Sequence, residues 1–211
     1  EFRRVLFRSR QHVSTQIPQE PAPQRGSLPL RYWFCWVALF FSIAGEFAIQ
    51  FWSAALVRER THLSAAAATT LVLAFPLGMA LGRWFSAYIS PKLGIDKRLI
   101  TSMFLQGTGF FGFWFSTSPL LSFFSLLIVG LGTSVQFALS TLRMLRIAYE
   151  KPDLAMGISS LGAGIAIASS PLFLGILADR FGIIDGFLMV PILFLIALTI
   201  IILVPLKEGE R

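Results

Sequence analysis

The sequence places a carboxylate in the middle of its first long apolar run, the segment Tyr32–Val57. Glu46 lies near the centre of this run, and Gln50 follows four residues later, so both side chains share one face of a helix. Inserting a carboxylate at the centre of a bilayer costs at least ~2.5 kcal/mol, so such residues are rarely without a role. Two interpretations stay open. Glu46 either exchanges protons or binds a polar solute on a pathway, or it bonds to a neighbouring helix as structural glue.

A third candidate, Gln136, lies in a later apolar run among Ser134 and Ser140. The same alternatives apply to Gln50 and Gln136, because an amide in a span either contacts a ligand or forms an interhelical hydrogen bond. Gln106, in the run between these two, is interpreted as a packing residue.

The composition excludes several classes of protein. Hydrophobic residues make up 55% of the chain and charged residues only 14%, which is unusual for a soluble domain. The net charge of +7 comes from short segments between apolar runs, so we expect no nucleic-acid partner. The chain has a single cysteine, Cys35, and both histidines, His12 and His62, lie outside the apolar runs. We therefore predict no metal site and no cofactor. Without a nucleophile beside a histidine, we also predict that the protein is not an enzyme.

Six apolar runs are long enough to cross the roughly 30 Å of a bilayer as helices. The predicted fold is therefore an all-α, polytopic membrane helix bundle. Its predicted spans are Tyr32–Val57, Ser64–Ile89, Leu99–Ser116, Leu120–Ala148, Ala155–Leu177 and Ile184–Leu206.

The basic residues predict the orientation of these spans. Most of them fall on one side, namely Arg25, Arg31, Lys92, Lys97, Arg98, Arg143, Arg146, Lys151, Lys207 and Arg211. The opposite side receives Arg58, Arg60 and Arg180. The positive-inside rule then places both chain ends in the cytoplasm of a cell with this protein in its plasma membrane.

The first thirty residues differ from the rest. Segment Glu1–Ser9 has no initiator Met and matches the conceptual translation of a common sequencing-adapter oligonucleotide, so we interpret it as non-native. The alternative is a genuine Arg-rich juxtamembrane segment. Residues 10–30 are polar and rich in Pro and Gln, which is typical of a solvated linker. We assign the linker to the cytoplasm and residues 31–211 to the six-span domain.

Two interhelical junctions resemble each other. Segment Ala87–Arg98 aligns with Gly175–Asp185 through a small residue, a basic residue followed by an apolar one, and Gly-Ile. The offset is three spans, an odd number, so the copies have opposite orientations in the membrane. The bundle is thus predicted to consist of two inverted three-helix repeats, as in secondary transporters.

The second junction also resembles a motif of the major facilitator superfamily, G-x-x-x-D-R-x-G-R-R. Gly94, Lys97 and Arg98 match its glycine and its basic pair, whereas Pro91 replaces its aspartate. The resemblance to the carboxyl-terminal half of such a transporter extends over residues 10–211, and it includes the Gly and Pro pattern of Gly157–Ile176. It implies that Gly82, Arg83 and the matching loop residues belong to a cytoplasmic gate.

The resemblance implies an incomplete twelve-span secondary transporter, of bacterial type, that moves a small molecule by alternating access. Its partners would be the bilayer, the substrate, protons and a missing amino-terminal half of the same polypeptide. The first and fourth spans of each half line the cavity in this family, which makes Glu46, Gln50 and Gln136 the implied pathway residues. Glu46 would carry the proton, because burial favours the neutral carboxyl group and water access favours its release. A non-catalytic scaffold or assembly subunit is the alternative.

Overall fold

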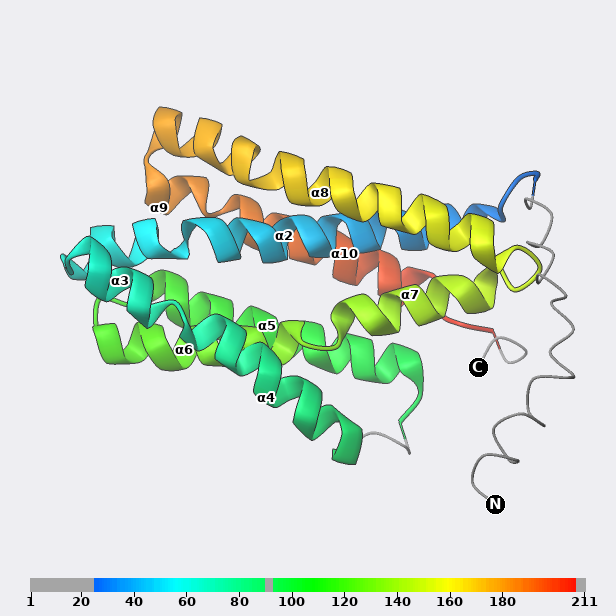
Figure 1. Ribbon diagram of the computed structural model, residues 1–211, viewed down its shortest axis with the longest axis horizontal. Helices are drawn as coiled ribbons and strands as arrows, with labels where there is room; N and C mark the ends of the chain where they lie inside the picture. The colour runs from blue at the N-terminus through cyan, green and yellow to red at the C-terminus, as the bar shows by residue number, and fades with distance from the viewer. Residues whose placement is uncertain (1–24, 90–92, 208–211) are drawn as a thin grey trace, which may run out of the picture.

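The computed structural model describes residues 25–89 and 93–207, and the regular structure of this part of the chain is entirely α-helical. The predictions for residues 1–24, including the adapter-derived segment and most of the linker, lie outside the described residues. The helices are α2 (Leu30–Thr61), α3 (Ala65–Leu71), α4 (Ala74–Ile89), α5 (Ile95–Phe115), α6 (Pro119–Thr133), α7 (Gln136–Ile147), α8 (Pro152–Phe181), α9 (Ile183–Gly186) and α10 (Met189–Leu203) (Figure 1).

These helices form six rods, which confirms the predicted all-α membrane bundle. Three rods are interrupted and consist of α3 with α4, α6 with α7, and α9 with α10. Five of the six rods are long and apolar enough to cross a membrane. The remaining rod is α5. Helix α5 is less apolar because it begins with charged residues and carries Gln106 near its middle.

Proline explains two of the interruptions. Its ring clashes with the carbonyl group four residues earlier, and it has no N–H to donate. For Pro76 that carbonyl belongs to Val72, where α3 ends, and for Pro191 it belongs to Phe187, just after α9. The chain continues through both sites as turns, so each rod keeps its course across the bundle (Figure 1).

The interruption between α6 and α7 involves no proline. It falls at Ser134 and Val135, after Gly130 and Gly132, and clustered Gly and Ser residues are a known cause of helix breaks. The sequence predicted one continuous span here, Leu120–Ala148. The break divides that span into two helices with a turn between them.

The bundle has two layers, which meet through α7 and through direct contacts of α5 with α10. One layer contains α4, α5 and α6, and the other contains α2, α8 and α10 (Figure 1). Glycines allow the close contacts of the first layer: a Cβ on Gly130 would collide with the backbone of α4 at Phe75, and one on Gly132 would collide with the backbone of α5 at Gln106. Helix α7 contacts α2, α5 and α8.

Helices α2, α5 and α8 extend past their predicted bounds, and all three begin at the same end of the bundle (Figure 1). Helix α5 begins at Ile95, after the extended residue Gly94, so the basic pair assigned to the loop lies within its first turn. Helix α2 is 32 residues long, or about 48 Å, and extends past its apolar run at both ends. The described chain ends, residues 25 and 207, lie at this end (Figure 1).

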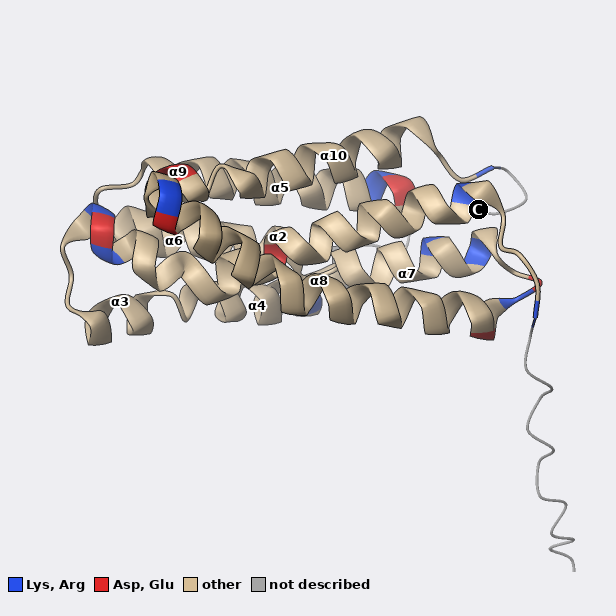
Figure 2. Ribbon diagram, turned by 90° about the horizontal axis from the view of Figure 1, so that it is seen from above, with Lys and Arg blue, Asp and Glu red and all other residues tan. Residues whose placement is uncertain are grey.

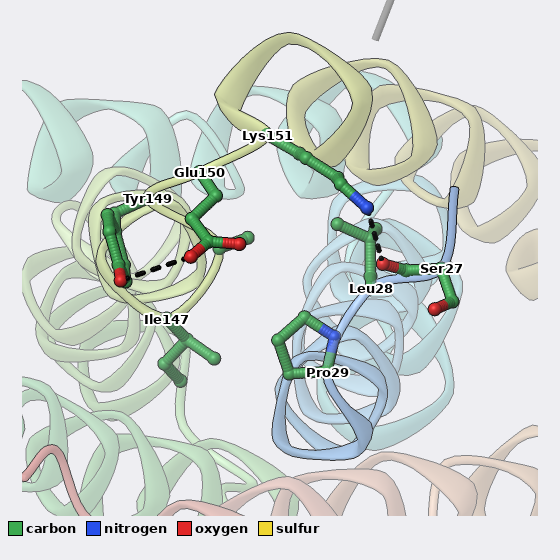
Figure 3. A pocket seen from close by; sticks show the side chains of 8 residues that line it. Ser27, Leu28, Pro29, Ile147, Tyr149, Glu150 and Lys151 are labelled. Atoms are coloured by element: carbon green, nitrogen blue, oxygen red, sulfur yellow. Dashed lines mark hydrogen bonds between the residues drawn. The ribbon is translucent and has the colours of Figure 1, made fainter. Parts of the chain in front are cut away.

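A polar cavity of about 350 Å³ lies at the end of the bundle where α2 begins. It separates the segment before α2 from the turn between α7 and α8 (Figure 3). The Lys151 Nζ group spans it and donates to the Ser27 carbonyl oxygen at 3.2 Å, and the Tyr149 hydroxyl group donates to Glu150 Oε1 at 3.2 Å. The Lys151–Ser27 hydrogen bond joins the segment before α2 to the α7–α8 turn, far along α2 from Glu46.

Candidate functional site

Charged residues gather at the ends of the helices, and the middles of the spans are almost free of them (Figure 2). Glu46 is an exception. It lies halfway along α2 and is half-buried. Its carboxylate makes no hydrogen bond and no ion pair within the part of the chain that the structure describes.

Arg83 is exposed, and its position is set by the break between α6 and α7. Its Nε donates a long, 3.5 Å hydrogen bond to the carbonyl oxygen of Ser134, the residue at which α6 ends. Carbonyl groups at the end of a helix carry partial negative charge, which favours a cation there. The neighbouring Gly82 fixes α4 at this place, because a Cβ on it would collide with the Ser134 side chain.

Helix α2 also makes a contact next to this break. Ser42, one helical turn before Glu46, donates from its hydroxyl group to Gln136 Oε1 at 2.8 Å. Gln136 is the first residue of α7 and lies two positions after Ser134. Contacts from α2 and α4 therefore converge on the region of this break.

Gln136 is a member of a buried hydrogen-bonded chain. Its Nε2 donates to Gln106 Oε1 at 2.7 Å and to the Gly132 carbonyl oxygen at 3.1 Å. Gln106 Nε2 in turn donates to Thr133 Oγ1 at 2.9 Å. We call Ser42, Gln136, Gln106 and Thr133 the glutamine chain, and none of these side chains is more than 7% exposed. In this structure Gln136 forms hydrogen bonds with neighbouring helices. Of the two interpretations of this residue, the interhelical hydrogen bond is therefore the one seen here.

Gln50 lies one turn beyond Glu46 on α2, as the spacing predicts. Its side chain is exposed and forms no hydrogen bond within the described residues. Glu46 and Gln50 therefore lie on the same side of α2 as Ser42, but they form no hydrogen bond with the glutamine chain. Among the described residues, no group of three or more His, Cys, Asp or Glu side chains could hold a metal ion.

Comparison with known families identifies this architecture. The family model of the Major Facilitator Superfamily matches residues 35–211. The chain belongs to this superfamily. A comparison with curated proteins gave no match. Major Facilitator Superfamily members are membrane transporters of small molecules, so this chain is an integral membrane protein of that class.

The superfamily loop motif is only partly described. Pro91, which replaces the motif's aspartate, lies outside the described residues, as does the middle of the first repeat copy. Gly94 precedes α5, Lys97 is exposed and Arg98 is half-buried. Arg98 lines a cavity of about 340 Å³ between α4, α5 and the α6–α7 break, and Gly82 lines the same cavity. The structure thus brings together two of the predicted gate residues.

A buried ion pair at the end of the bundle was missed by the sequence analysis. Arg143 of α7 is only 1% exposed, and its Nε donates to Asp96 Oδ1 of α5 at 2.8 Å. Its remaining N–H groups donate to Cys35 Sγ of α2 at 3.0 Å and to the carbonyl oxygens of Ile201 and Val204 at the end of α10. The other oxygen of Asp96 accepts from the backbone N–H of Leu206 at 2.7 Å.

The sequence analysis assigned Arg143 only to the basic residues on the cytoplasmic side of the membrane. The structure places it instead at a junction of four helix ends within this chain. The signal that could have found it is Asp96 itself. This superfamily motif lacks its usual aspartate at Pro91, and Asp96 supplies a carboxylate five residues later.

Proposed function

We propose that this superfamily member is a secondary active transporter that moves a small molecule by alternating access and couples the movement to protons through Glu46. The observation that carries the proposal is the state of this carboxylate. It is half-buried in the middle of a span, and it lacks a hydrogen bond or ion pair among the described residues. Structural glue would have a partner, as every member of the glutamine chain does.

The proton-coupling step follows from the surroundings of Glu46. A carboxyl group in the low dielectric of a span favours its neutral form, and contact with water favours the ionised form. A conformational change that admits water would shift the balance between these forms. Gln50, on the same face, is positioned to contact a polar solute beside the carboxyl group.

The proposed transporter is the plasma-membrane protein of a bacterium, and its six spans work with six others. The exposed face around Glu46, Gln50 and Arg83 would line the pathway between the two halves. The polar segment before α2 would be the cytoplasmic loop that joins them. Arg25, Arg31, Arg146, Lys151 and Lys207 support a cytoplasmic location for the end of the bundle where α2 begins.

The test is transport by the full-length gene product in proteoliposomes. The solute is chosen by screening sugars, organic anions, amino acids and cationic drugs for uptake driven by an imposed proton gradient. We expect Glu46→Gln to abolish accumulation against a gradient and to leave exchange of solute across the membrane intact. Glu59→Gln, which changes an exposed carboxylate near the end of α2, is the matched control. Proton-driven accumulation that survives in Glu46→Gln contradicts the proposal.

The scaffold alternative makes a different prediction for the same variant. In this alternative Glu46 joins α2 to a neighbouring helix as structural glue. In that case Glu46→Gln would lower the melting temperature of the purified protein, and no solute of the screen would be transported by the unsubstituted protein.

A further inference from the structure

We infer that the cavity between α4, α5 and the α6–α7 break binds one anionic phospholipid, with Arg98 bonded to the lipid phosphate and an acyl chain against the apolar wall. This is the cavity of about 340 Å³ that Arg98 and Gly82 line, and we call it the α4–α5 cavity. The inference goes beyond the proposed function and does not depend on Glu46.

The α4–α5 cavity is polar at one end and apolar at the other. On α5 its lining residues are Arg98, Thr101, Ser102 and Leu105, a spacing that places them on one face of the helix. Arg98 lies in the first turn of α5, and Leu105 lies about 10 Å deeper in the span. Ser86 lies in the last turn of α4, which ends close to where α5 begins (Figure 1). The polar lining is therefore at the mouth of the cavity, at the end of the span.

The deeper wall of the cavity suits a hydrocarbon chain. Leu105 and Phe85 line it and are 41% and 52% exposed, and Leu131 of α6 lines it as well. Exposed apolar side chains on spanning helices are matched by lipid chains, which are as apolar as leucine. A hydrated solute would gain nothing from this wall. A ligand with a charged head and an apolar chain fits both ends of the cavity.

The guanidinium group of Arg98 is available to such a ligand. It is half-buried, and it forms no hydrogen bond or ion pair with another described residue. The carboxylate of Asp96, two positions earlier, is bonded to Arg143 Nε at 2.8 Å and to the Leu206 N–H group at 2.7 Å. None of the described residues that line the cavity is acidic. The planar fork of a guanidinium group matches phosphate oxygens, and basic pockets between spans bind lipid head groups.

The remaining polar groups limit the ligand to one phosphate. The hydroxyl groups of Ser86 and Ser102 donate to carbonyl oxygens of their own helices at 2.8 and 2.7 Å. The donors left at the mouth are Arg98 and Thr101, which is exposed. Lys97 is exposed next to Arg98 and repels a head group that carries a cation, such as choline. The site therefore favours a singly charged anionic lipid over a zwitterionic one.

The first experiment measures retention of lipid by the full-length gene product. The purified protein, in a nonionic detergent, is incubated with equal amounts of dioleoyl phosphatidylglycerol and dioleoyl phosphatidylcholine, and native mass spectrometry counts the lipids that stay bound. We expect phosphatidylglycerol to be retained at least tenfold better than phosphatidylcholine. Equal retention of the two lipids contradicts the inference.

Substitution of the two neighbouring basic residues assigns the site. Arg98→Gln should lose one bound phosphatidylglycerol, with its affinity lowered about tenfold, because a charge-assisted hydrogen bond is lost. Lys97→Gln is the matched control. It removes the same charge one position away, from an exposed side chain that does not line the cavity, and should keep that lipid. An equal loss in both variants would show attraction to surface charge in general, and the inference would be wrong.

A second pair of variants tests the cavity itself. Thr101→Trp places a large side chain in it and should displace the same phosphatidylglycerol. Thr108→Trp makes the identical change on an exposed residue of the same face of α5, outside the α4–α5 cavity, and should not. Melting temperatures of the two variants show that both are folded. Retention of this lipid in Thr101→Trp as in Thr108→Trp would contradict the inference.

A soluble phosphate distinguishes a lipid site from a solute site. Excess glycerol 3-phosphate, which carries the phosphate and lacks the acyl chains, should not displace phosphatidylglycerol from the unsubstituted protein. Displacement that is absent in Arg98→Gln would show that the cavity takes a soluble phosphate, and the lipid inference would fail. Neither result bears on proton coupling through Glu46, which the transport assay tests separately.

Discussion

Two polar groupings meet at the break between α6 and α7, and they differ in how completely their atoms are bonded. In the glutamine chain, buried amide and hydroxyl groups bond to one another across α2, α5, α6 and α7. Glu46 and Arg83 lie beside it, more exposed, with one long hydrogen bond between Arg83 and the backbone. A polar residue within a span is therefore not by itself a sign of function. The contrast between bonded and unbonded polar groups separates structural residues from candidates for the pathway.

The largest effect on stability is expected for Asp96→Asn. This variant leaves Arg143 buried without its carboxylate, and removal of one partner of a buried ion pair is strongly destabilising. We expect a loss of about 3 kcal/mol in the free energy of unfolding, measured by denaturant titration in detergent micelles. Glu46→Gln makes the same carboxylate-to-amide change and should have little effect on the free energy of unfolding. Equal losses for both variants would contradict the contrast between bonded and unbonded polar groups.

A smaller loss is expected for Gln136→Leu. It leaves the Ser42 hydroxyl group and the Gln106 Oε1 atom buried without partners, which should cost about 2 kcal/mol. The same titration measures it. Gln50→Leu is the matched control, since it makes the identical change on the exposed face of α2. If Gln136→Leu were as stable as this control, the glutamine chain would not be structural glue.

Ser42→Ala should cost about 1 kcal/mol, because it removes one hydrogen bond to Gln136 and leaves a carbonyl oxygen without that donor. Transport should keep its proton dependence. A loss of proton coupling in this variant would join the glutamine chain to the pathway and would remove the distinction between the two groupings.

The smallest effect on stability is expected for Glu46→Gln, within about 0.5 kcal/mol of the unsubstituted protein, because no described hydrogen bond or ion pair is lost. Its effect on proton-driven accumulation should nevertheless be complete. A melting-temperature scan and a transport assay on one preparation measure both quantities. A large drop in melting temperature would indicate that Glu46 stabilises the bundle.

The sequence was sufficient for the spans and insufficient for the contacts between them. Apolar runs of bilayer length predict rods because a buried backbone must satisfy its own hydrogen bonds. The partners of Gln136 and Arg143 are set by the rotation of each rod about its axis. Arg143 bonds to Cys35, 108 positions away, and to the carbonyl oxygen of Ile201, 58 positions away, and no local pattern encodes such pairs.

The interruptions show the same limit on a smaller scale. Pro76 and Pro191 are visible in the sequence, and the structure interrupts both rods where proline chemistry requires it. The α6–α7 break has only Gly130, Gly132 and Ser134 as its signal, and small residues serve helix packing just as often. Because this break positions Arg83 and Gln136, the sequence named some of the site residues without the element that arranges them.

The close approach of α4 and α6 has a mechanical consequence. Gly78 and Gly130 leave no room between these two backbones, so the two helices are interlocked and we expect them to move as one rigid body. Arg83 belongs to that rigid body, and Glu46 belongs to α2 in the other layer. Any rocking of one layer against the other therefore changes the separation of Glu46 and Arg83.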